Sequence, residues 1–293
     1  AETYPKARAC LASGRVVHEA GGSEGWELGF ALASALAYAR ALAGAGLSPE
    51  DAFARISLGL SADAEYFTAI AKLRAGRLLW AKLTAACEVS APAMLEVRSS
   101  RRMLARLDAW TNLLRLTAAG FGAAAGGAEV VTLDPFTTPY HSGDRRASAL
   151  ARRQARNIQL VLMEEAGLGR VADPAGGSGH IEALTEGLAR AGWAAFQAIE
   201  RAGGAAEALK EGVVAEAVAF AREARAQAYL DDARGLIGVT RFPNKHDEPP
   251  ATETVDPDLF ARTAPDFGLP GPDDRCPPLQ PVRWAQPFEG DAE

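Results

Sequence analysis

The chain has 293 residues, 48% of them hydrophobic, and 31 Lys and Arg against 37 Asp and Glu give it a formal net charge of −6. This length is enough for one large domain or two ordinary ones, and the acidic balance disfavours nucleic acid and anionic membranes as partners. No apolar run reaches the roughly 18 residues that a membrane-spanning helix needs, and the N-terminal residues lack an apolar segment of signal-peptide length. Three scattered cysteines make no disulfide framework, so we expect a cytoplasmic protein.

The first half of the chain alternates short apolar segments with longer helical ones. The segments expected as strands are residues 15–18, 56–60, 94–97 and 130–133. The segments expected as helices are residues 23–42, 62–87 and 108–124, with Ser23 placed to cap the first and a short helix opening near residue 48. Such alternation is typical of parallel βα units, and four of these units make half of an eight-stranded TIM (β/α)8 barrel.

After Pro135 the pattern becomes helical and then irregular. Helices are expected at residues 147–167, 178–202 and 205–231, and residues 243–293 are rich in Pro, Asp and Glu, as in an extended tail or linker. We therefore predict an α/β fold made of a partial TIM (β/α)8 barrel followed by a helical C-terminal extension. The predicted parts are the barrel half at 1–140, the helical extension at 141–242 and the tail at 243–293.

Several segments resemble the methylmalonyl-CoA mutase family, and together they cover almost the whole chain. The most specific is ARNIQLVLMEEAGLGRVADPAGGSGHIEALT at residues 155–185. The others are EAGGSEGWELGFALASALAYARA at 19–41, RISLGLSADAEYFTAIAKLRAGRLLW at 55–80, DAWTNLLRLTAAGFGAAAGGAEVVTLDPF at 108–136, GVTRFPN at 238–244 and PVRWAQPFE at 281–289. The resemblance implies the last four βα units of an acyl-CoA mutase barrel.

The family rearranges acyl-CoA carbon skeletons with adenosylcobalamin. The first half of its barrel and its cobalamin domain have no counterpart in this sequence. The cobalt-ligating histidine of the family lies in an Asp-x-His-x-x-Gly loop, and none of His18, His141, His180 and His246 lies in that pattern. The resemblance therefore implies an interior fragment, or one piece of a split protein, and we expect that this chain does not itself bind adenosylcobalamin.

The positions that carry polar active-site groups in catalytic members differ here. Alignment places Arg15 and Val16 where a Tyr-His pair would stand, and Arg98 where a glutamine would contact substrate. Leu133 and Thr137 stand where an asparagine and a glutamate would face the cofactor. We therefore expect no catalytic residue in this chain, and it most resembles the non-catalytic small (beta) subunit of the family. His18 lies two positions beyond the pair and is expected to face differently or to lie past the strand end.

One match favours substrate contact. Arg55 and Ser57 match an Arg-x-Ser that touches the CoA phosphates in catalytic members, and arginine is a bidentate phosphate donor. The alternative is that Arg55 is a solvated residue at a strand entrance.

The remaining candidates have structural interpretations. The turn at residues 173–179 opens a helix and could bind an anion, but it lacks the Gly-Lys-Ser/Thr of a phosphate loop, and we favour a tight turn in which Ser178 caps the helix and Asp173 fixes the loop. Glu164 and Glu165 could suggest acid-base work, but on a helix of this periodicity they are expected to be solvated or ion-paired with arginines one turn away. A basic cluster is either a solvated face or a contact for a partner subunit; its members are Arg98, Arg101, Arg102 and Arg106. Four tryptophans are expected in the core, namely Trp26, Trp80, Trp110 and Trp193.

Two functions remain open. The chain is either the non-catalytic small subunit that supports a catalytic large subunit, or it contributes half of an active barrel that interconverts methylmalonyl-CoA and succinyl-CoA. A newly evolved small-molecule site is a third possibility. The expected partners are a catalytic large subunit or the missing N-terminal barrel half, together with acyl-CoA, and the open edges of half a barrel also favour a homo-oligomer.

Overall fold

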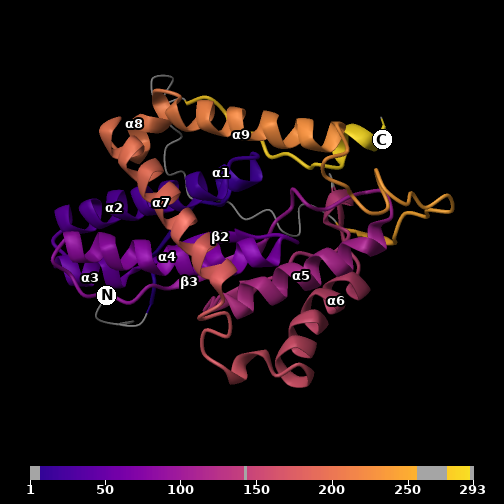
Figure 1. Cartoon of the computed structure of the whole chain (residues 1–293), viewed down its shortest axis with the longest axis horizontal. Helices are drawn as coiled ribbons and strands as arrows, with labels where there is room; N and C mark the ends of the chain where they lie inside the picture. The colour runs from indigo at the N-terminus through magenta and orange to yellow at the C-terminus, as the bar shows by residue number, and fades with distance from the viewer. Residues whose placement is uncertain (1–6, 142–143, 256–275, 291–293) are drawn as a thin grey trace.

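The computed structural model of the protein describes residues 7–141, 144–255 and 276–290 (Figure 1). Its main sheet is parallel, with the strand order β1-β2-β3-β4. The strands are β1 Cys10–Ser13, β2 Ile56–Ala62, β3 Leu95–Ser99 and β4 Val130–Thr132. Each strand is followed in the chain by its neighbour in the sheet, with helices between them, which confirms the predicted mixed α/β fold of successive parallel βα units. Closure into a barrel stays a prediction.

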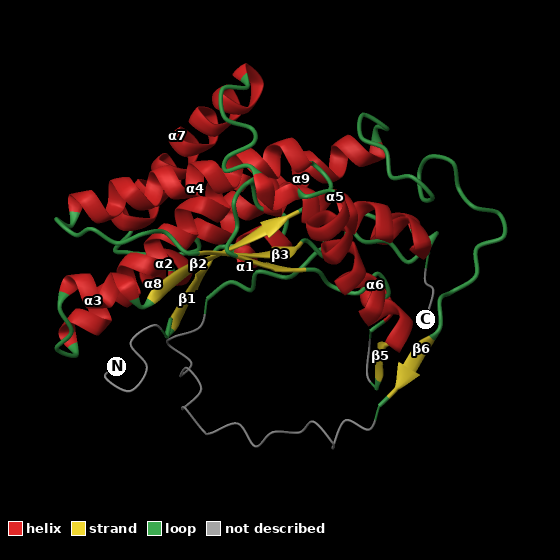
Figure 2. Cartoon of the chain, turned by 90° about the horizontal axis from the view of Figure 1, so that it is seen from below, coloured by secondary structure: helices red, strands yellow, loops and turns green. Residues whose placement is uncertain are grey.

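Three long helices cover one face of this sheet (Figure 2). They are α2 Glu24–Gly44, α4 Tyr66–Ala86 and α5 Asn112–Ala125, and two short helices, α1 Arg15–Glu19 and α3 Pro49–Ala54, complete the connections. As predicted, the Ser23 hydroxyl caps α2 by accepting a hydrogen bond from the Trp26 amide. Every second residue of β2 and β3 points into the core beneath these helices, among them Leu58, Leu60 and Val97.

The opposite face of the sheet is polar and partly open. The strand register aligns Leu11 with Ser57, and Glu96 with Val130, on this face. Leu11 and Val130 keep 45% and 39% of their surface exposed. Exposed aliphatic side chains on the edge strands of a parallel sheet indicate a surface that a further element could cover.

The elements of the helical extension are α6 Ala149–Leu160, a π-helical turn Val161–Glu165, α7 Gly179–Arg201, α8 Ala205–Lys210 and α9 Val213–Leu230. In this extension, α7 packs on α2 and α4, whereas α6 packs on α5. Glycines let α7 approach α2 closely, because a Cβ atom added at Gly29 would lie 2.6 Å from the Cβ of Ala195. A small antiparallel pair, β5 Arg145–Ala147 with β6 Thr252–Thr254, lies beside α6 (Figure 2).

Within the described residues, four short 3-10 helices lie at Ala109–Thr111, Thr138–Tyr140, Leu168–Arg170 and Gln286–Phe288. Part of the predicted tail, residues 256–275, lies outside the described residues. The segment around Trp284 is packed rather than extended into solvent, because Trp284 is buried and stacks on Tyr229 of α9. None of the described helices is long and apolar enough to cross a membrane.

Several predicted elements need correction. Residues 15–18 were predicted as a strand, but they belong to α1, and the strand is Cys10–Ser13. The chain turns at Gly14, whose amide bonds to the carbonyl of Gly59 and whose carbonyl accepts the amides of Val17 and His18. The predicted helix at 205–231 is broken, because Gly212 adopts a φ of +79° between α8 and α9.

The tryptophan prediction holds only in part. Trp80 is fully buried, as predicted, and Trp26 and Trp193 pack against the core while partly buried. The prediction that Trp110 is a core residue is wrong, because 48% of its surface is exposed. It lies in the 3-10 turn before α5 with its ring against Phe136, so one ring face is covered and the other meets solvent.

Candidate functional site

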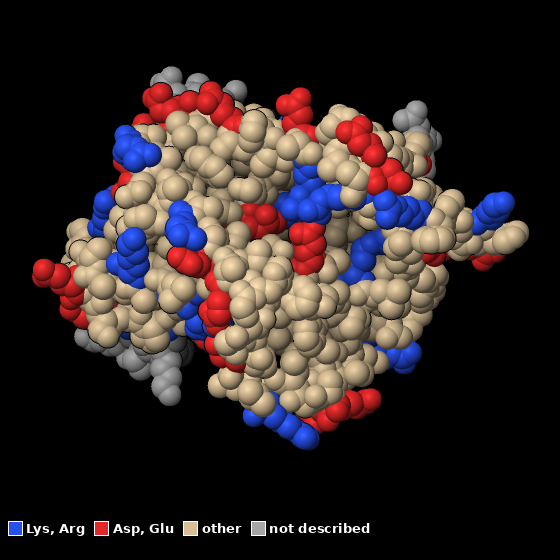
Figure 3. Space-filling model, in the orientation of Figure 1, with Lys and Arg blue, Asp and Glu red and all other residues tan. Residues whose placement is uncertain are grey.

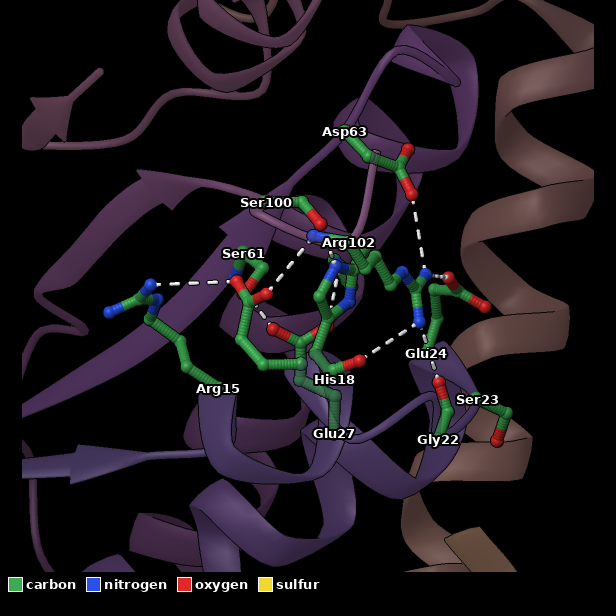
Figure 4. A network of polar contacts seen from close by, with 12 residues as sticks. Arg15, His18, Gly22, Ser23, Glu24, Glu27, Ser61, Asp63, Ser100 and Arg102 are labelled. Carbon is green, nitrogen blue, oxygen red and sulfur yellow. Dashed lines mark hydrogen bonds and ion pairs between the residues drawn. The ribbon is translucent and has the colours of Figure 1, made fainter. Parts of the chain in front are cut away.

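A buried cluster of charged and polar side chains lies at the carboxyl ends of β2 and β3 (Figure 4). Ligand sites of parallel βα folds lie at this end of the sheet, so the cluster is the first place to look for chemistry. Its members come from four parts of the fold: His18 and Glu19 from α1, Glu24 and Glu27 from α2, Ser61 and Asp63 from the end of β2, and Ser100 and Arg102 from the segment after β3, joined by Lys72 of α4.

Three of these side chains form a row. The Nε2 atom of His18 lies 2.9 Å from the Oγ of Ser100, and its Nδ1 atom lies 3.1 Å from Oε2 of Glu27. An ionised carboxylate only accepts hydrogen bonds, so Nδ1 carries the proton and the Ser100 hydroxyl donates to Nε2. Burial and the neighbouring charge of Arg102 lower the pKa of His18, so the ring is neutral near pH 7.

Glu27 is the anchor of the row. Its carboxylate accepts hydrogen bonds from Lys72 Nζ at 2.5 Å and from the Ser61 amide at 2.5 Å, besides the contact with His18. Burial alone would raise the pKa of Glu27, but Lys72 and His18 lower it well below the usual range for a glutamate. A fully buried carboxylate that stays ionised in this way ties α1, α2, α4 and β2 together.

Arg102 forms the second half of the cluster. Its guanidinium donates to the carbonyl oxygens of His18 and Gly22, to Glu24 Oε1 at 2.6 Å and to Asp63 Oδ2 at 3.3 Å. Burial would raise the pKa of Glu24, but Arg102, Lys72 and Arg225 lower it to about 2. The pKa of Asp63 is lowered as well, mainly by Arg102 against the effect of burial.

The cluster reaches the surface in a hollow between α5 and α9. Figure 3 shows basic and acidic side chains close together in this hollow. Arg225 of α9 lies 3.7 Å from Glu24 and 3.9 Å from Asp63, and Arg234 pairs with Glu65. The hollow has a volume of about 450 Å³, and Arg225 and Arg234 pair there with Asp63 and Glu65. It therefore connects the buried cluster to solvent through ion pairs.

The Ser100–His18–Glu27 row has the donor order of a nucleophile, base and acid. All three residues are completely buried, so no substrate carbonyl could reach the Ser100 oxygen. Every charged group in the row has its partners inside the protein. The cluster therefore holds the loops after β1, β2 and β3 in place, and nucleophilic chemistry is excluded by burial rather than by residue type.

At the five positions where catalytic members carry active-site groups, this chain has two apolar side chains and three polar ones that contact other residues of the chain. Val16 is 48% exposed and Leu133 is buried, and both are apolar. Arg15 lies 3.6 Å from Glu19, and Arg98 pairs with Asp134 through its Nε and Nη2 atoms. The Thr137 hydroxyl is buried 3.0 Å from Nε2 of His141.

His18 lies past the end of β1, in α1, which confirms one of its two expected placements. The basic cluster is not one face. Arg102 is 1% exposed and ion-paired inside the protein, so neither a solvated face nor a partner contact describes it. Arg98 and Arg101 share the carboxylate of Asp134 instead.

The structure places Arg55 and Ser57 at the amino end of β2, away from the buried cluster. Arg55 donates from Nη1 to the carbonyl of Ala7 at 3.1 Å. The Ser57 hydroxyl is buried and donates to Oε1 of Glu96 at 2.6 Å, which leaves Arg55 as the better phosphate donor of the two. Their contact with CoA phosphates stays a prediction.

For the turn before α7, the predicted role of Asp173 is confirmed and the predicted cap by Ser178 is wrong. Asp173 binds Arg74, whose Nε lies 3.0 Å from Oδ1, so it does fix the loop. Ser178 holds the N-cap position, but its side chain makes no capping hydrogen bond, and the Glu182 carboxylate accepts a hydrogen bond from the Gly177 amide. Glu164 and Glu165 are exposed, as predicted for solvated side chains.

Sequence reasoning missed Glu27, Lys72, Asp63 and Ser100. The available signal was the position of Glu27 and Lys72 on the buried side of otherwise apolar helices. A charged residue at such a position is rarely buried without a partner. Each could have been predicted to have a buried partner of opposite charge, but their separation of 45 residues does not reveal that they pair with each other.

The sequence profile of the family named Methylmalonyl-CoA mutase matches residues 1–265. The chain is 41% identical over 271 residues to the methylmalonyl-CoA mutase small subunit of Streptomyces virginiae, covering 92% of this chain and 42% of that protein. It is 35% identical over 246 residues to the small subunit of Propionibacterium freudenreichii subsp. shermanii (83% of this chain, 38% of that protein), and 34% identical over 253 residues to the large subunit of Streptomyces virginiae (84% and 34%). It thus spans less than half the length of each relative. The profile match over most of the sequence and the 41% identity show that this chain belongs to the methylmalonyl-CoA mutase family.

Proposed function

We propose that this chain serves in a methylmalonyl-CoA mutase-type, cobalamin-dependent acyl-CoA isomerase, as the non-catalytic small subunit that supports a catalytic large subunit. The observation that carries the proposal is the difference in identity to the two subunits of one organism. The chain is 41% identical to the small subunit of Streptomyces virginiae and 34% identical to its large subunit. The same order holds for Propionibacterium freudenreichii subsp. shermanii, at 35% and 32%.

The side chains at the carboxyl ends of the strands favour a non-catalytic role for this chain. Radical rearrangement needs polar groups that face a dry cavity and grip the substrate carbonyl. Here buried carboxylates at that end are held by cations of the same chain, as in the pairs Glu27–Lys72 and Arg98–Asp134. Two of the aligned positions, Val16 and Leu133, have no polar side-chain atom.

The histidines of this chain do not fit the cobalt-ligand role that the family cofactor, adenosylcobalamin, requires. Both ring nitrogens of His18 are used inside the protein, and Nε2 of His141 lies 3.0 Å from the Thr137 hydroxyl. The ring of His180 packs on Phe67, and His246 is exposed on an irregular segment. In this proposal, cobalamin binding belongs to other parts of the assembly.

The open side of the sheet is the proposed contact with the partner. The outer edges of β1 and β4 pair with no other strand among the described residues, and unpaired edges with exposed aliphatic side chains favour association. The partner would be the large subunit, a polypeptide that supplies the N-terminal half of the barrel, or a second copy of the chain. A cytoplasmic location fits this role, since Cys10, Cys87 and Cys276 are free thiols.

The second candidate is a chain that contributes half of an active barrel interconverting methylmalonyl-CoA and succinyl-CoA. Arg55 at the entrance of β2 favours it, because a guanidinium at a strand end can grip a CoA phosphate. Under this alternative the chain would bind acyl-CoA directly.

A turnover assay separates the two candidates. The purified chain is mixed with adenosylcobalamin and methylmalonyl-CoA, and the formation of succinyl-CoA is followed, with a complete two-subunit mutase as the positive control. The small-subunit proposal predicts no turnover by the chain alone or with an added N-terminal barrel half. Turnover in either mixture contradicts that proposal and favours the half-barrel enzyme.

A further inference from the structure

A pocket at the carboxyl ends of β3 and β4 has four arginines among its lining residues. It has a volume of about 430 Å³ and lies between the strand ends and the start of α6, away from the Ser100–His18–Glu27 row. The chargeable side chains that line it are Arg98, Arg101, Asp134, His141, Arg146 and Arg152. This volume falls within the range of small-molecule sites.

The charge in the pocket is unbalanced at its inner end. Arg98 and Arg101 both bind the buried carboxylate of Asp134, so one negative charge faces two positive ones. Their hydrogen bonds to it use only Nε and Nη2, and within the described part of the chain the Nη1 atom of neither arginine makes a hydrogen bond. The two side chains are 38% and 49% exposed, so their remaining N–H groups can be reached from solvent.

The other side of the pocket carries an arginine that is paired with a carboxylate, and a neutral histidine ring. Arg152 lies 3.1 Å from Glu253, with 53% of its side chain exposed at the rim. Burial, Arg101 and Arg146 lower the pKa of His141, against the opposing effect of Asp134, so its ring is neutral at pH 7. A lowered histidine pKa beside several arginines is what a positive local potential produces.

We propose that this pocket binds a small, doubly charged oxyanion, such as a short dicarboxylate or a phosphate group, between the guanidinium groups of Arg98, Arg101 and Arg152. Guanidinium forks pair with carboxylate and phosphate oxygens, and the binding of such a group offsets the excess positive charge that Asp134 leaves. The inference does not depend on the proposed subunit role.

His141 supplies a local reporter for the test. The chain has only four histidines, so the Cε1 protons give four resonances, and a His141→Gln variant assigns the one of interest. An anion bound beside His141 stabilises its protonated form, so its pKa rises and its resonance moves. His246 is exposed on a separate segment and should not respond.

The experiment uses the full chain at low ionic strength, titrated separately with sodium phosphate, sodium malonate and neutral malonamide, and followed by proton NMR and calorimetry. The proposal predicts a shift of the His141 resonance with phosphate, malonate or both, no shift with malonamide, and weaker binding as salt is added. A response to one anion alone identifies phosphate or carboxylate as the ligand chemistry. No movement of His141 with either anion overturns the proposal.

Variants locate the site. Arg98→Gln and Arg152→Gln should each weaken binding roughly tenfold or more, because each removes a charge-assisted donor. Arg190→Gln is the matched control, since Arg190 is an exposed arginine on α7 paired with Glu186, and it should leave binding unchanged. If Arg98→Gln does not fold, Arg152→Gln decides. Equal weakening by the pocket variants and the control would overturn the proposal.

Discussion

The ring of His18 lies 3.1 Å from the carboxylate of Glu27, and both side chains are completely buried. The contact joins α1, directly after β1, to the first turn of α2, and Lys72 brings α4 to the same carboxylate. The resemblance to a catalytic row is one of geometry alone, because solvent and substrate have no access. Its consequences are therefore expected in stability and in pH dependence.

The first prediction concerns acid. The folded pKa of His18 is lower than its unfolded value of 6.5, so its contribution to stability is complete above that value and is lost as the pH falls below it. The free energy of unfolding, measured with urea, should fall between pH 6.5 and 5 by at most about 1.4 kcal/mol per pH unit for this one proton. Glu24 and Glu27, with lowered pKa values, add their losses only at lower pH.

His18→Gln should remove most of this slope, whereas His246→Gln, at an exposed position, should leave it intact. The pKa of His141 is also lowered, so His141 should account for part of the slope that remains in the His18→Gln variant. An unchanged slope in a folded His18→Gln variant would show that the ring does not titrate as proposed.

The second prediction concerns the buried pair of Lys72 and Glu27. Lys72→Met removes the cation and should destabilise the fold by about 3–5 kcal/mol, because the carboxylate stays buried without its main partner. Glu27→Gln added to Lys72→Met should recover part of that loss, because the uncompensated charge is gone. Chemical denaturation of the wild type, both single variants and the double variant gives the coupling free energy. Strict additivity would mean that the two charges do not interact.

The third prediction tests how α7 seats on α2. Gly29→Leu forces a side chain into the space occupied by Ala195 and should destabilise by about 1–3 kcal/mol or more. Gly44→Ala is the control in the same helix, since nothing lies within 4 Å of an added Cβ there, and it should be neutral or slightly stabilising. Thermal unfolding of the two variants side by side provides the comparison, and a harmless Gly29→Leu would mean that α7 does not pack there.

The fourth prediction concerns CoA. If Arg55 grips a CoA phosphate, the chain should bind CoA weakly at low salt, with a free energy on the order of −4 to −5 kcal/mol, and affinity should fall as salt rises. Arg55→Ala should abolish binding. Ser57→Ala should change it little, since the Ser57 hydroxyl already donates to Glu96. Calorimetry that finds equal binding by wild type and Arg55→Ala, or none by either, would assign Arg55 a structural role only.

Most of the sheet could be predicted because β2, β3 and β4 are short apolar runs between long helical patterns. β1 could not be, since Cys10–Ser13 contains small residues of mixed polarity, while Val16-Val17 has the β-branched pattern typical of a strand and instead turns into α1. The prediction that Trp110 lies in the core was wrong for a related reason. Its ring lies in a turn and packs against one neighbour, Phe136, while the rest of its surface stays exposed. Local pattern does not report such tertiary effects.

The resemblance identifies Arg15, Val16, Arg98, Leu133 and Thr137 as the positions aligned with active-site groups of catalytic members, and the absence of a catalytic residue among them stays a prediction. The buried cluster depends on contacts over long sequence separations, such as His18 with Ser100, 82 residues apart. No spacing rule connects these residues, so only the folded structure brings them together.

The central claim, that the chain supports a catalytic large subunit, is tested most directly by co-expression with the methylmalonyl-CoA mutase large subunit of its own genome, followed by affinity capture of one chain and light scattering. Leu11→Glu, on the open face of β1, is compared with Leu78→Glu on α4, where a similar share of a leucine is exposed. The account predicts a stable complex that Leu11→Glu weakens and Leu78→Glu does not. A monomeric chain that leaves the large subunit uncaptured would contradict it.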